Sequence, residues 1–266
     1  MKKNLKNILL TTGLVTGLSF HSYSQSQINI KTNDELATDI AKTLEKNNID
    51  YFNPKNKELI DSLVKREVNL DMSNRIVYDD TELKNLALSI TKDCLIEDNE
   101  CKTINIYNYI QKNYKKIDDV TNEAKFPKET INEGGGDCED FAILNNSLLE
   151  NIGIKTKIIF LSNHAYSLVY GLNIENLVKK REEFYLDKIY EVMKSDTMRD
   201  ILLPDSAFTL LSKKLTMKEE IKSYNIDEKN WISVDPTIEG GYIGLENAIG
   251  KKMIIDSRTK EINYFE

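Results

Sequence analysis

Residues 133–153 are the part of the chain that most restricts its fold. Three consecutive glycines lead into Asp137, a good helix N-cap, and Asp140 three residues later completes the pattern of a capping box. Apolar side chains then recur every three or four positions up to Gly153, a residue type that commonly ends helices. The pattern predicts a helix whose buried face begins at Cys138.

A β-hairpin is predicted directly after this helix. Its two strand-like runs, 155–161 and 164–171, are joined by Ser162-Asn163, and the second run begins at His164. Side chains alternate between the two faces of a strand, so His164 shares a face with Tyr166, Leu168 and Tyr170. Because the apolar face of the helix must be covered, we expect the hairpin to pack against it.

Two further segments have strand character. Trp231-Ile-Ser-Val-Asp-Pro-Thr reads as a strand that Pro236 ends, with Trp231, Ser233 and Asp235 on one face. The stretch 252–265 predicts a final hairpin. Together with the central hairpin, these segments indicate an antiparallel sheet.

The rest of the chain is predicted to be helical. Over residues 33–117, apolar side chains at helical spacing indicate four helices: one from Asn33, one from Pro54, one capped by Asp80 or Thr81, and one over 104–114. The charged stretch 173–229 is interpreted as a helical insertion. The expected fold class is α+β, with an N-terminal helical region over 25–99 and a core over 100–266.

Residues 1–24 resemble a secretory signal peptide. Three lysines precede a weakly apolar run that is too short to span a membrane, and Ser22 and Ser24 are small residues at positions −3 and −1 of a cleavage site. The sequence therefore predicts an exported chain, periplasmic or extracellular, that is cleaved near Ser24 and has no stable membrane insertion. Cleavage would leave His164 as the single histidine and change the net charge from −7 to −10. This acidity argues against nucleic acid as a partner.

The three cysteines are Cys94, Cys101 and Cys138. In an oxidising compartment an odd number leaves one free thiol. A bridge between Cys94 and Cys101 would close a short polar loop and add about 2 to 3 kcal/mol of stability on the chain-entropy model. We expect this pair to form the disulfide and Cys138 to be free; three reduced, buried cysteines are the alternative.

Cys138, His164 and Asp235 have the residue types and placement of a nucleophile, a base and an orienting acid. A cysteine attacks as a thiolate, and the N-terminus of a helix stabilises that anion. A neutral imidazole can take the proton from sulfur and return it, and a carboxylate can hold the ring in the useful tautomer. His164 is the only imidazole of the cleaved chain, and Asp235 lies on a strand that could pair with the histidine strand.

The three blocks around these residues resemble the motifs of the transglutaminase-like superfamily, most of all its bacterial cysteine peptidases. The blocks are Gly136-Asp-Cys-Glu-Asp-Phe-Ala, His164-Ala-Tyr-Ser-Leu-Val and Trp231-Ile-Ser-Val-Asp-Pro-Thr. The resemblance implies a papain/transglutaminase-like core in which the cysteine helix packs on an antiparallel sheet. It also implies a nucleophile at Cys138, a base at His164 and a third member at Asp235.

The long separation between the histidine and the aspartate departs from the family pattern, in which the aspartate follows much sooner. Here Asp235 lies 71 positions after His164. The insertion over 173–229 would have to lie between neighbouring strands, as a lid or a recognition flap. Asp187 and Asp205 are competing acids, although neither lies in a strand pattern.

Three acidic residues surround the candidate nucleophile, and like charge would oppose thiolate formation. Asp137 and Asp140 can be used as helix caps, whereas Asp137, Glu139 and Asp140 together could bind calcium, a cofactor of some related peptidases as the resemblance implies. No cofactor is otherwise required. For the oxyanion, the N–H of Cys138 and the side chain of Asn132 are candidate donors.

The sequence predicts an exported thiol hydrolase, a peptidase or amidase, that acts on a protein or peptide through an acyl-enzyme at Cys138. A transglutaminase-type acyl transferase is one alternative, although the resemblance implies tryptophans around such an intermediate and Trp231 is the only one here. A non-catalytic cell-envelope binding or scaffold protein is another. A zinc site at Cys138 and His164 would have only two protein ligands. The sequence assigns no oligomeric state.

Overall fold

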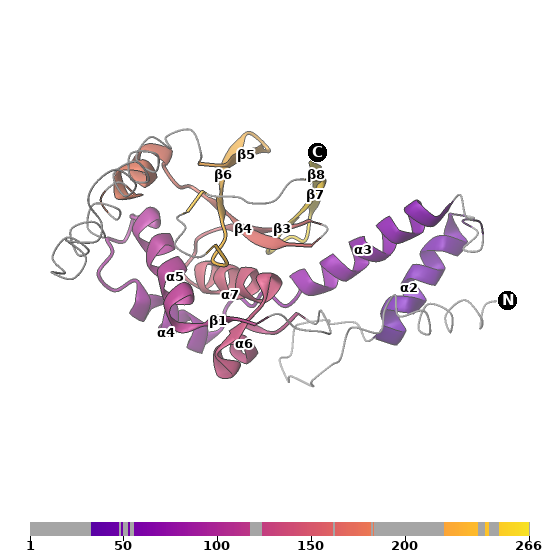
Figure 1. Cartoon of the computed structure of the whole chain (residues 1–266), viewed down its shortest axis with the longest axis horizontal. Helices are drawn as coiled ribbons and strands as arrows, with labels where there is room; N and C mark the ends of the chain where they lie inside the picture. The colour runs from indigo at the N-terminus through magenta and orange to yellow at the C-terminus, as the bar shows by residue number, and fades with distance from the viewer. Residues whose placement is uncertain are drawn as a thin grey trace, which may run out of the picture.

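The computed structural model has a helical layer, a central helix and an antiparallel sheet (Figure 1). It describes residues 33–47, 49, 53, 56–117, 124–161, 163–181, 183, 221–238, 243–244 and 250–265. The predicted signal peptide, 1–24, and the competing acids Asp187 and Asp205 lie outside these residues. Among the described residues, no helix combines the length and apolar character that a membrane crossing requires.

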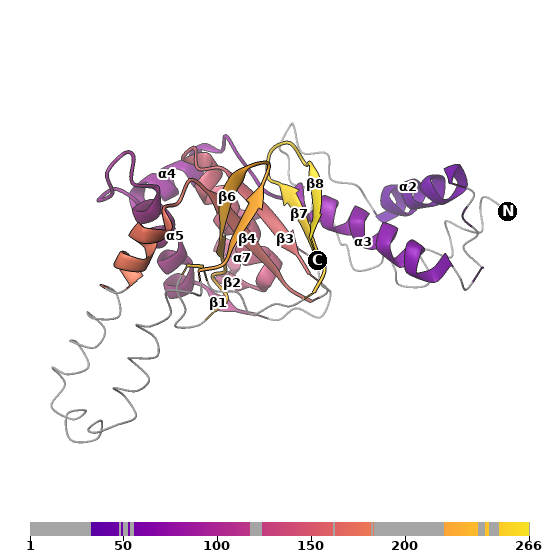
Figure 2. The same ribbon diagram turned by 90° about the horizontal axis from the view of Figure 1, so that it is seen from above.

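Two N-terminal helices, α2 (Asn33–Lys46) and α3 (Lys57–Ser73), pack against each other. Ile40 and Leu44 of α2 are fully buried, as the helical spacing of the apolar residues predicts. The pair extends away from the sheet, and only the C-terminal part of α3 reaches the β7 side of the core (Figures 1 and 2).

Three further helices surround the central one: α4 (Thr81–Ile90), α5 (Asn99–Asn113) and α6 (Pro127–Glu133). Asp80 caps α4, as predicted, by accepting the N–H groups of Glu82 and Leu83. The predicted disulfide, Cys94–Cys101, ties the start of α5 to the preceding loop, and Cys138 is the free cysteine. Helix α5 begins at Asn99 rather than at residue 104, because Asp98 caps a polar first turn that carries no apolar periodicity.

The cysteine helix α7 (Cys138–Asn151) lies between the sheet and the other helices, with every residue from Glu139 onward buried (Figure 1). The sheet is antiparallel throughout, with strand order β5-β6-β4-β3-β7-β8. Its strands are β3 (Thr156–Phe160), β4 (Ala165–Tyr170), β5 (Ser223–Ile226), β6 (Lys229–Val234), β7 (Lys252–Asp256) and β8 (Ile262–Phe265). The predicted central and final hairpins are thus present, and the α+β architecture is confirmed.

Each face of the sheet has its own apolar contacts. Val169 and Ile232 pack towards α7, whereas Tyr166, Leu168 and Trp231 belong to a cluster on the opposite face. The sheet curls, so that Tyr224 of β5 and Phe265 of β8, on its two edge strands, lie 6.3 Å apart between ring centroids. The predicted alternation of the histidine strand is therefore correct.

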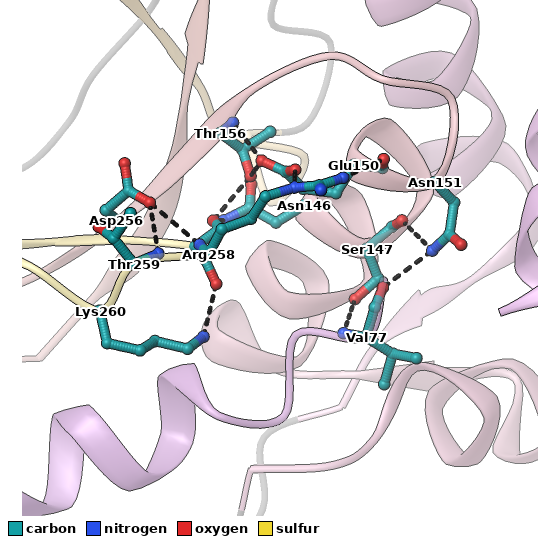
Figure 3. A network of polar contacts seen from close by, with 11 residues as sticks. Val77, Asn146, Ser147, Glu150, Asn151, Thr156, Asp256, Arg258, Thr259 and Lys260 are labelled. Carbon is teal, nitrogen blue, oxygen red and sulfur yellow. Dashed lines mark hydrogen bonds and ion pairs between the residues drawn. The ribbon is translucent and has the colours of Figure 1, made fainter. Parts of the chain in front are cut away.

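Polar contacts fix the C-terminal half of α7 (Figure 3). The Glu150 carboxylate accepts hydrogen bonds from the N–H of Thr156 at 2.6 Å and from Nε of Arg258 at 2.5 Å. Lys260, on the turn between β7 and β8, donates from Nζ to the carbonyl of Ser73 at 2.7 Å. These contacts join α7, the last hairpin and the end of α3 into one body.

Of the predicted helical insertion, 173–229, the structure describes residues 173–181, 183 and 221–229, and the rest lies outside the described residues. Residues 174–181 form a helix, but the prediction is wrong for 223–229, which form β5 and the start of β6. Asp227 and Glu228 make the turn between these strands with φ values of 53° and 59°. Two-residue turns of this kind are usually marked by Asn-Gly or Asp-Gly, so the sequence carried no clear signal for this hairpin.

Candidate active site

Cys138 is the first residue of α7, placed there by a capping box. Asp137 accepts the N–H of Asp140 at 3.4 Å, and Asp140 accepts the N–H of Asp137 at 3.3 Å. A Cβ atom at Gly136 would collide with the Asp140 side chain, so only glycine fits where the chain enters the helix. The short strands β1 (Lys115–Lys116) and β2 (Gly135–Gly136) pair in parallel beside it. The predicted capping therefore positions the sulfur.

The sulfur of Cys138 contacts an acid and a backbone amide. Its Sγ donates to Oε2 of Glu139 at 3.0 Å, and the N–H of Ala165 donates to it. Burial, and then the Glu139 carboxylate, raises the pKa of the Cys138 thiol, while the Ala165 amide acts in the opposite direction. Burial and Glu139 therefore disfavour the thiolate in this arrangement.

His164 and Asp235 come together through the pairing of β4 with β6. His164 lies immediately before β4 and Asp235 immediately after β6, and these antiparallel strands are hydrogen-bonded neighbours. Nε2 of His164 lies 2.6 Å from Oδ2 of Asp235. The His164 side chain is 20% exposed and that of Asp235 only 1%, so the acid lies behind the ring. Because Nε2 is engaged by Asp235, Nδ1 is the ring nitrogen left for proton exchange with a thiol.

The second carboxylate oxygen of Asp235 is bound by its own turn. Oδ1 accepts the N–H of Thr237 at 3.0 Å and its hydroxyl at 2.6 Å. Both carboxylate oxygens therefore have partners, which fixes the direction in which Asp235 faces the imidazole. The Asp-Pro-Thr sequence thus forms a local turn that presents the acid.

Helix α5 holds this turn from the other side. Nε2 of Gln111 donates to the carbonyl of Ile238 at 2.6 Å and lies 3.3 Å from the carbonyl of Pro236. The Tyr107 hydroxyl also reaches the Ile238 carbonyl, at 3.4 Å. Sequence reasoning missed Gln111, because one amide among the polar residues of a helix has no local signature.

A cleft of about 550 Å³ contains both Cys138 and His164. Its wall includes the C-terminal half of α3, Lys116 of β1, the start of α7 and the segment between β3 and β4. The lining residues are Lys65, Val68, Asn69, Met72, Lys116, Asp137, Cys138, Glu139, Phe160, Leu161, Asn163, His164 and Ala165. The sulfur and the imidazole therefore open into the same space.

The three acidic residues at the start of α7 do not form a ligand set for calcium. The Asp140 carboxylate is taken up by the N–H of Lys125 at 2.6 Å and by its Nζ at 3.1 Å, as well as by the capping box. Glu139 is directed to the thiol. Among the described residues, no group of three or more His, Cys, Asp or Glu side chains is arranged to hold a metal ion. Asp137 and Asp140 thus act as helix caps, whereas Glu139 contacts the thiol.

Asn132, a candidate oxyanion donor, is exposed near the end of α6 and does not line the cleft. The N–H of Cys138 lies in the first turn of α7, where N–H groups have no carbonyl partner within the helix. Of the two candidates, the Cys138 amide is the one at the reaction centre.

Comparison with protein families agrees with this geometry. The family model of the transglutaminase-like superfamily matches residues 84–236, more than half of the 266-residue chain. The chain belongs to the transglutaminase-like superfamily. The match includes Cys138, His164 and Asp235, and it excludes α2 and α3. Comparisons with curated proteins and with solved structures gave no match.

Proposed function

We propose that this member of the transglutaminase-like superfamily is a thiol hydrolase that cleaves a peptide or amide bond. The observation that carries the proposal is the His164–Asp235 contact of 2.6 Å beside a cleft that also contains Cys138. Enzymes of this chemical type need a nucleophile, a base and a group that orients the base. The shared cleft of Cys138 and His164 and the contact of His164 with Asp235 support these three roles.

In the proposed mechanism, Nδ1 of His164 takes the proton from the Cys138 thiol, and the thiolate attacks the carbonyl carbon of the substrate. Asp235 stabilises the resulting imidazolium through Nε2. The N–H of Cys138 donates to the oxyanion of the tetrahedral intermediate. As that intermediate collapses, the imidazolium gives its proton to the leaving amine, and a thioester remains on sulfur. His164 then removes a proton from water, which attacks the thioester and releases a carboxylic acid and the thiol.

The Glu139 carboxylate must move away from the Cys138 sulfur before this reaction begins. Its carboxylate accepts the thiol hydrogen in the described structure and competes with the imidazole for that proton. A negative charge beside sulfur also disfavours the thiolate. We therefore assign the described arrangement to the resting enzyme, and rotation of the Glu139 side chain to the step that precedes attack.

Hydrolysis is preferred over acyl transfer to an amine. The resemblance to the superfamily associates transamidation with tryptophans around the acyl-enzyme, and the only tryptophan of this chain does not line the cleft. Trp231 is 4% exposed and packs against Tyr170, with ring centroids 5.4 Å apart. Water would therefore reach the thioester without a tryptophan shield.

We further propose that the protein is exported and acts on a protein or peptide. The signal-peptide pattern of residues 1–24 and the Cys94–Cys101 disulfide support an oxidising compartment. No metal is part of the mechanism, so cleavage in the presence of a calcium chelator should equal cleavage without it.

A non-catalytic binding protein is the second candidate, and the burial and raised pKa of the Cys138 thiol favour it. Iodoacetamide separates the two candidates, because under non-reducing conditions Cys138 is the only cysteine outside the disulfide. Because Glu139 restrains the sulfur in the resting enzyme, the comparison uses Glu139→Gln: an enzyme thiol should then be alkylated rapidly near pH 7, whereas a buried structural thiol would still react slowly.

The decisive experiment combines this labelling with peptide cleavage. A tryptic digest of a cellular proteome serves as substrate, and mass spectrometry identifies new peptide ends. Cys138→Ala should abolish cleavage and leave the unfolding temperature nearly unchanged. Cleavage that survives Cys138→Ala would refute the nucleophile, and slow alkylation of Glu139→Gln together with no cleavage by the natural chain would favour the binding protein.

A further inference from the structure

One wall of the reactive cleft is supplied by α3, a helix that lies outside the family match. Four α3 residues line the cleft: Lys65, Val68, Asn69 and Met72. Their spacing of three, one and three places them on a single face of the helix. The candidate reactive groups therefore lie within the family match, and α3, which lies outside that match, forms one wall of the cleft.

The cleft-lining face of α3 is apolar at one end and charged at the other. Met72 is 4% exposed and belongs to the same apolar cluster as Ala165, whose N–H contacts the Cys138 sulfur. Lys65 lies at the other end of the face and is exposed. The apolar end of the wall is thus near the sulfur, and the charged end is farther from it.

The apolar end is completed by the sheet. Phe160 and Leu161, at the end of β3, line the cleft and are 4% and 5% exposed. Together with Val68 and Met72 they provide an apolar surface beside the reaction centre. A substrate side chain that contacts this surface gains free energy by leaving water, provided that it is apolar.

The charged end of this α3 face carries Lys65. Among the described residues, no carboxylate lies within ion-pair distance of Lys65, and partial burial lowers its pKa. The acidic residues that line the cleft, Asp137 and Glu139, are at the sulfur end. A substrate carboxylate near Lys65 would supply the missing counter-charge.

We propose that this face of α3 selects extended peptides that carry an apolar residue beside the scissile bond and an acidic residue about three positions away. The spacing follows from the helix: the seven steps from Lys65 to Met72 rise about 10 Å, and an extended chain covers that distance in roughly three residues. This inference rests on the proposed thiol hydrolase and adds its substrate class.

The test uses the full chain and the same proteome-derived peptide digest. Cleavage sites of the natural protein should be enriched about fivefold in Asp or Glu at two to four positions from the cut, with an apolar residue adjacent to it. Lys65→Gln should remove the acidic preference, and Lys65→Glu should replace it with a preference for Lys or Arg. Lys84→Glu, an exposed position on α4 with the same charge change, is the control and should leave the profile unchanged.

The outcomes separate this inference from the proposed function. Cleavage that depends on Cys138 but shows no acidic preference, or a preference that Lys65→Glu does not alter, overturns the role of α3 and leaves the hydrolase intact. Absence of any cleavage by the natural chain overturns both. Iodoacetamide labelling of Cys138 should be the same in the Lys65 variants and the natural chain, because this small probe reaches the sulfur without contacting Lys65.

Discussion

Nε2 of His164 lies 2.6 Å from Oδ2 of Asp235, a residue 71 positions later in the chain. The contact depends on β4 and β6 being adjacent, although everything between 171 and 228 separates them in sequence. The acid is nearly inaccessible and the ring is partly open to the cleft. The imidazole is therefore held at Nε2 by a buried acid, and the His164 side chain lines the cleft.

Replacement of the acid tests this orientation. Asp235→Asn keeps the size of the side chain but removes the charge that stabilises an imidazolium, so kcat for peptide cleavage should fall by about 100-fold or more. Steady-state kinetics on one cleaved peptide is the measurement. Asp227→Asn, on the exposed turn between β5 and β6, is the control. A loss of less than about threefold in Asp235→Asn would contradict the assigned role.

Gln111 should act as a positioning residue for Asp235. Gln111→Leu shortens the side chain by one atom and removes the hydrogen bonds to the carbonyls of Pro236 and Ile238. Small displacements of reacting groups slow catalysis strongly, so kcat should fall about tenfold to 100-fold while KM stays nearly constant. Asn113→Ala, an exposed position on the same helix, should not change kcat. If kcat per folded molecule were unchanged in Gln111→Leu, the amide would have only a structural role.

Glu139 should restrain the thiol. Glu139→Gln removes the negative charge beside sulfur, so the pKa of the Cys138 thiol should fall and iodoacetamide should label it faster at pH 7. Each unit by which that pKa falls gives about a tenfold larger thiolate fraction. The measurement is the labelling rate as a function of pH, with Glu97→Gln on the exposed loop as control. An unchanged pH profile would show that Glu139 does not restrain the sulfur.

Asp137 should contribute a loss of stability as the pH rises from about 4 to 8. Burial, together with the Glu139 and Asp140 carboxylates, raises the pKa of Asp137 to about 8. Between the ordinary pKa of an aspartate, about 4, and this value, the folded state binds the proton more tightly than the unfolded state, so the free energy of unfolding falls as the pH increases.

Asp137→Asn isolates this effect, because asparagine is also a good N-cap but does not titrate. The unfolding temperature of Asp137→Asn relative to the natural chain should rise by several degrees between pH 5 and pH 8 and then stay level. Asp93→Asn, at an exposed loop position, should show no such trend. If the difference in unfolding temperature between Asp137→Asn and the natural chain were the same from pH 5 to pH 8, Asp137 would not have a raised pKa.

The local parts of the fold were predictable from the sequence. The capping box at Asp137, the helix that follows and the central hairpin each carry their own short-range signals, and the structure has all three. The Cys94–Cys101 disulfide was predictable because only a short loop separates the two cysteines. Such features depend on residues within about ten positions of each other.

Most features that the sequence did not reveal depend on distant segments, whereas the β5–β6 hairpin is local but lacks the usual turn signal. The β5–β6 turn uses Asp227 and Glu228 instead of glycine. Gln111 and Lys65 look like ordinary helical surface residues, and only the folded chain brings the first to the Asp235 turn and the second to the cleft. The sequence suggested the pairing of His164 with Asp235 from strand character and from the resemblance to the superfamily motifs, whereas their separation gave no support for it.

The late position of β6 affects how the site is assembled during synthesis. A ribosome releases the sulfur and the imidazole well before Asp235, so a growing chain that already contains the central hairpin still lacks the partner of its imidazole. Under the proposed mechanism, a chain that is truncated between residues 164 and 235 would have a nucleophile whose base is unoriented. Under the proposed mechanism, such a fragment could not digest its neighbours while it is still being made.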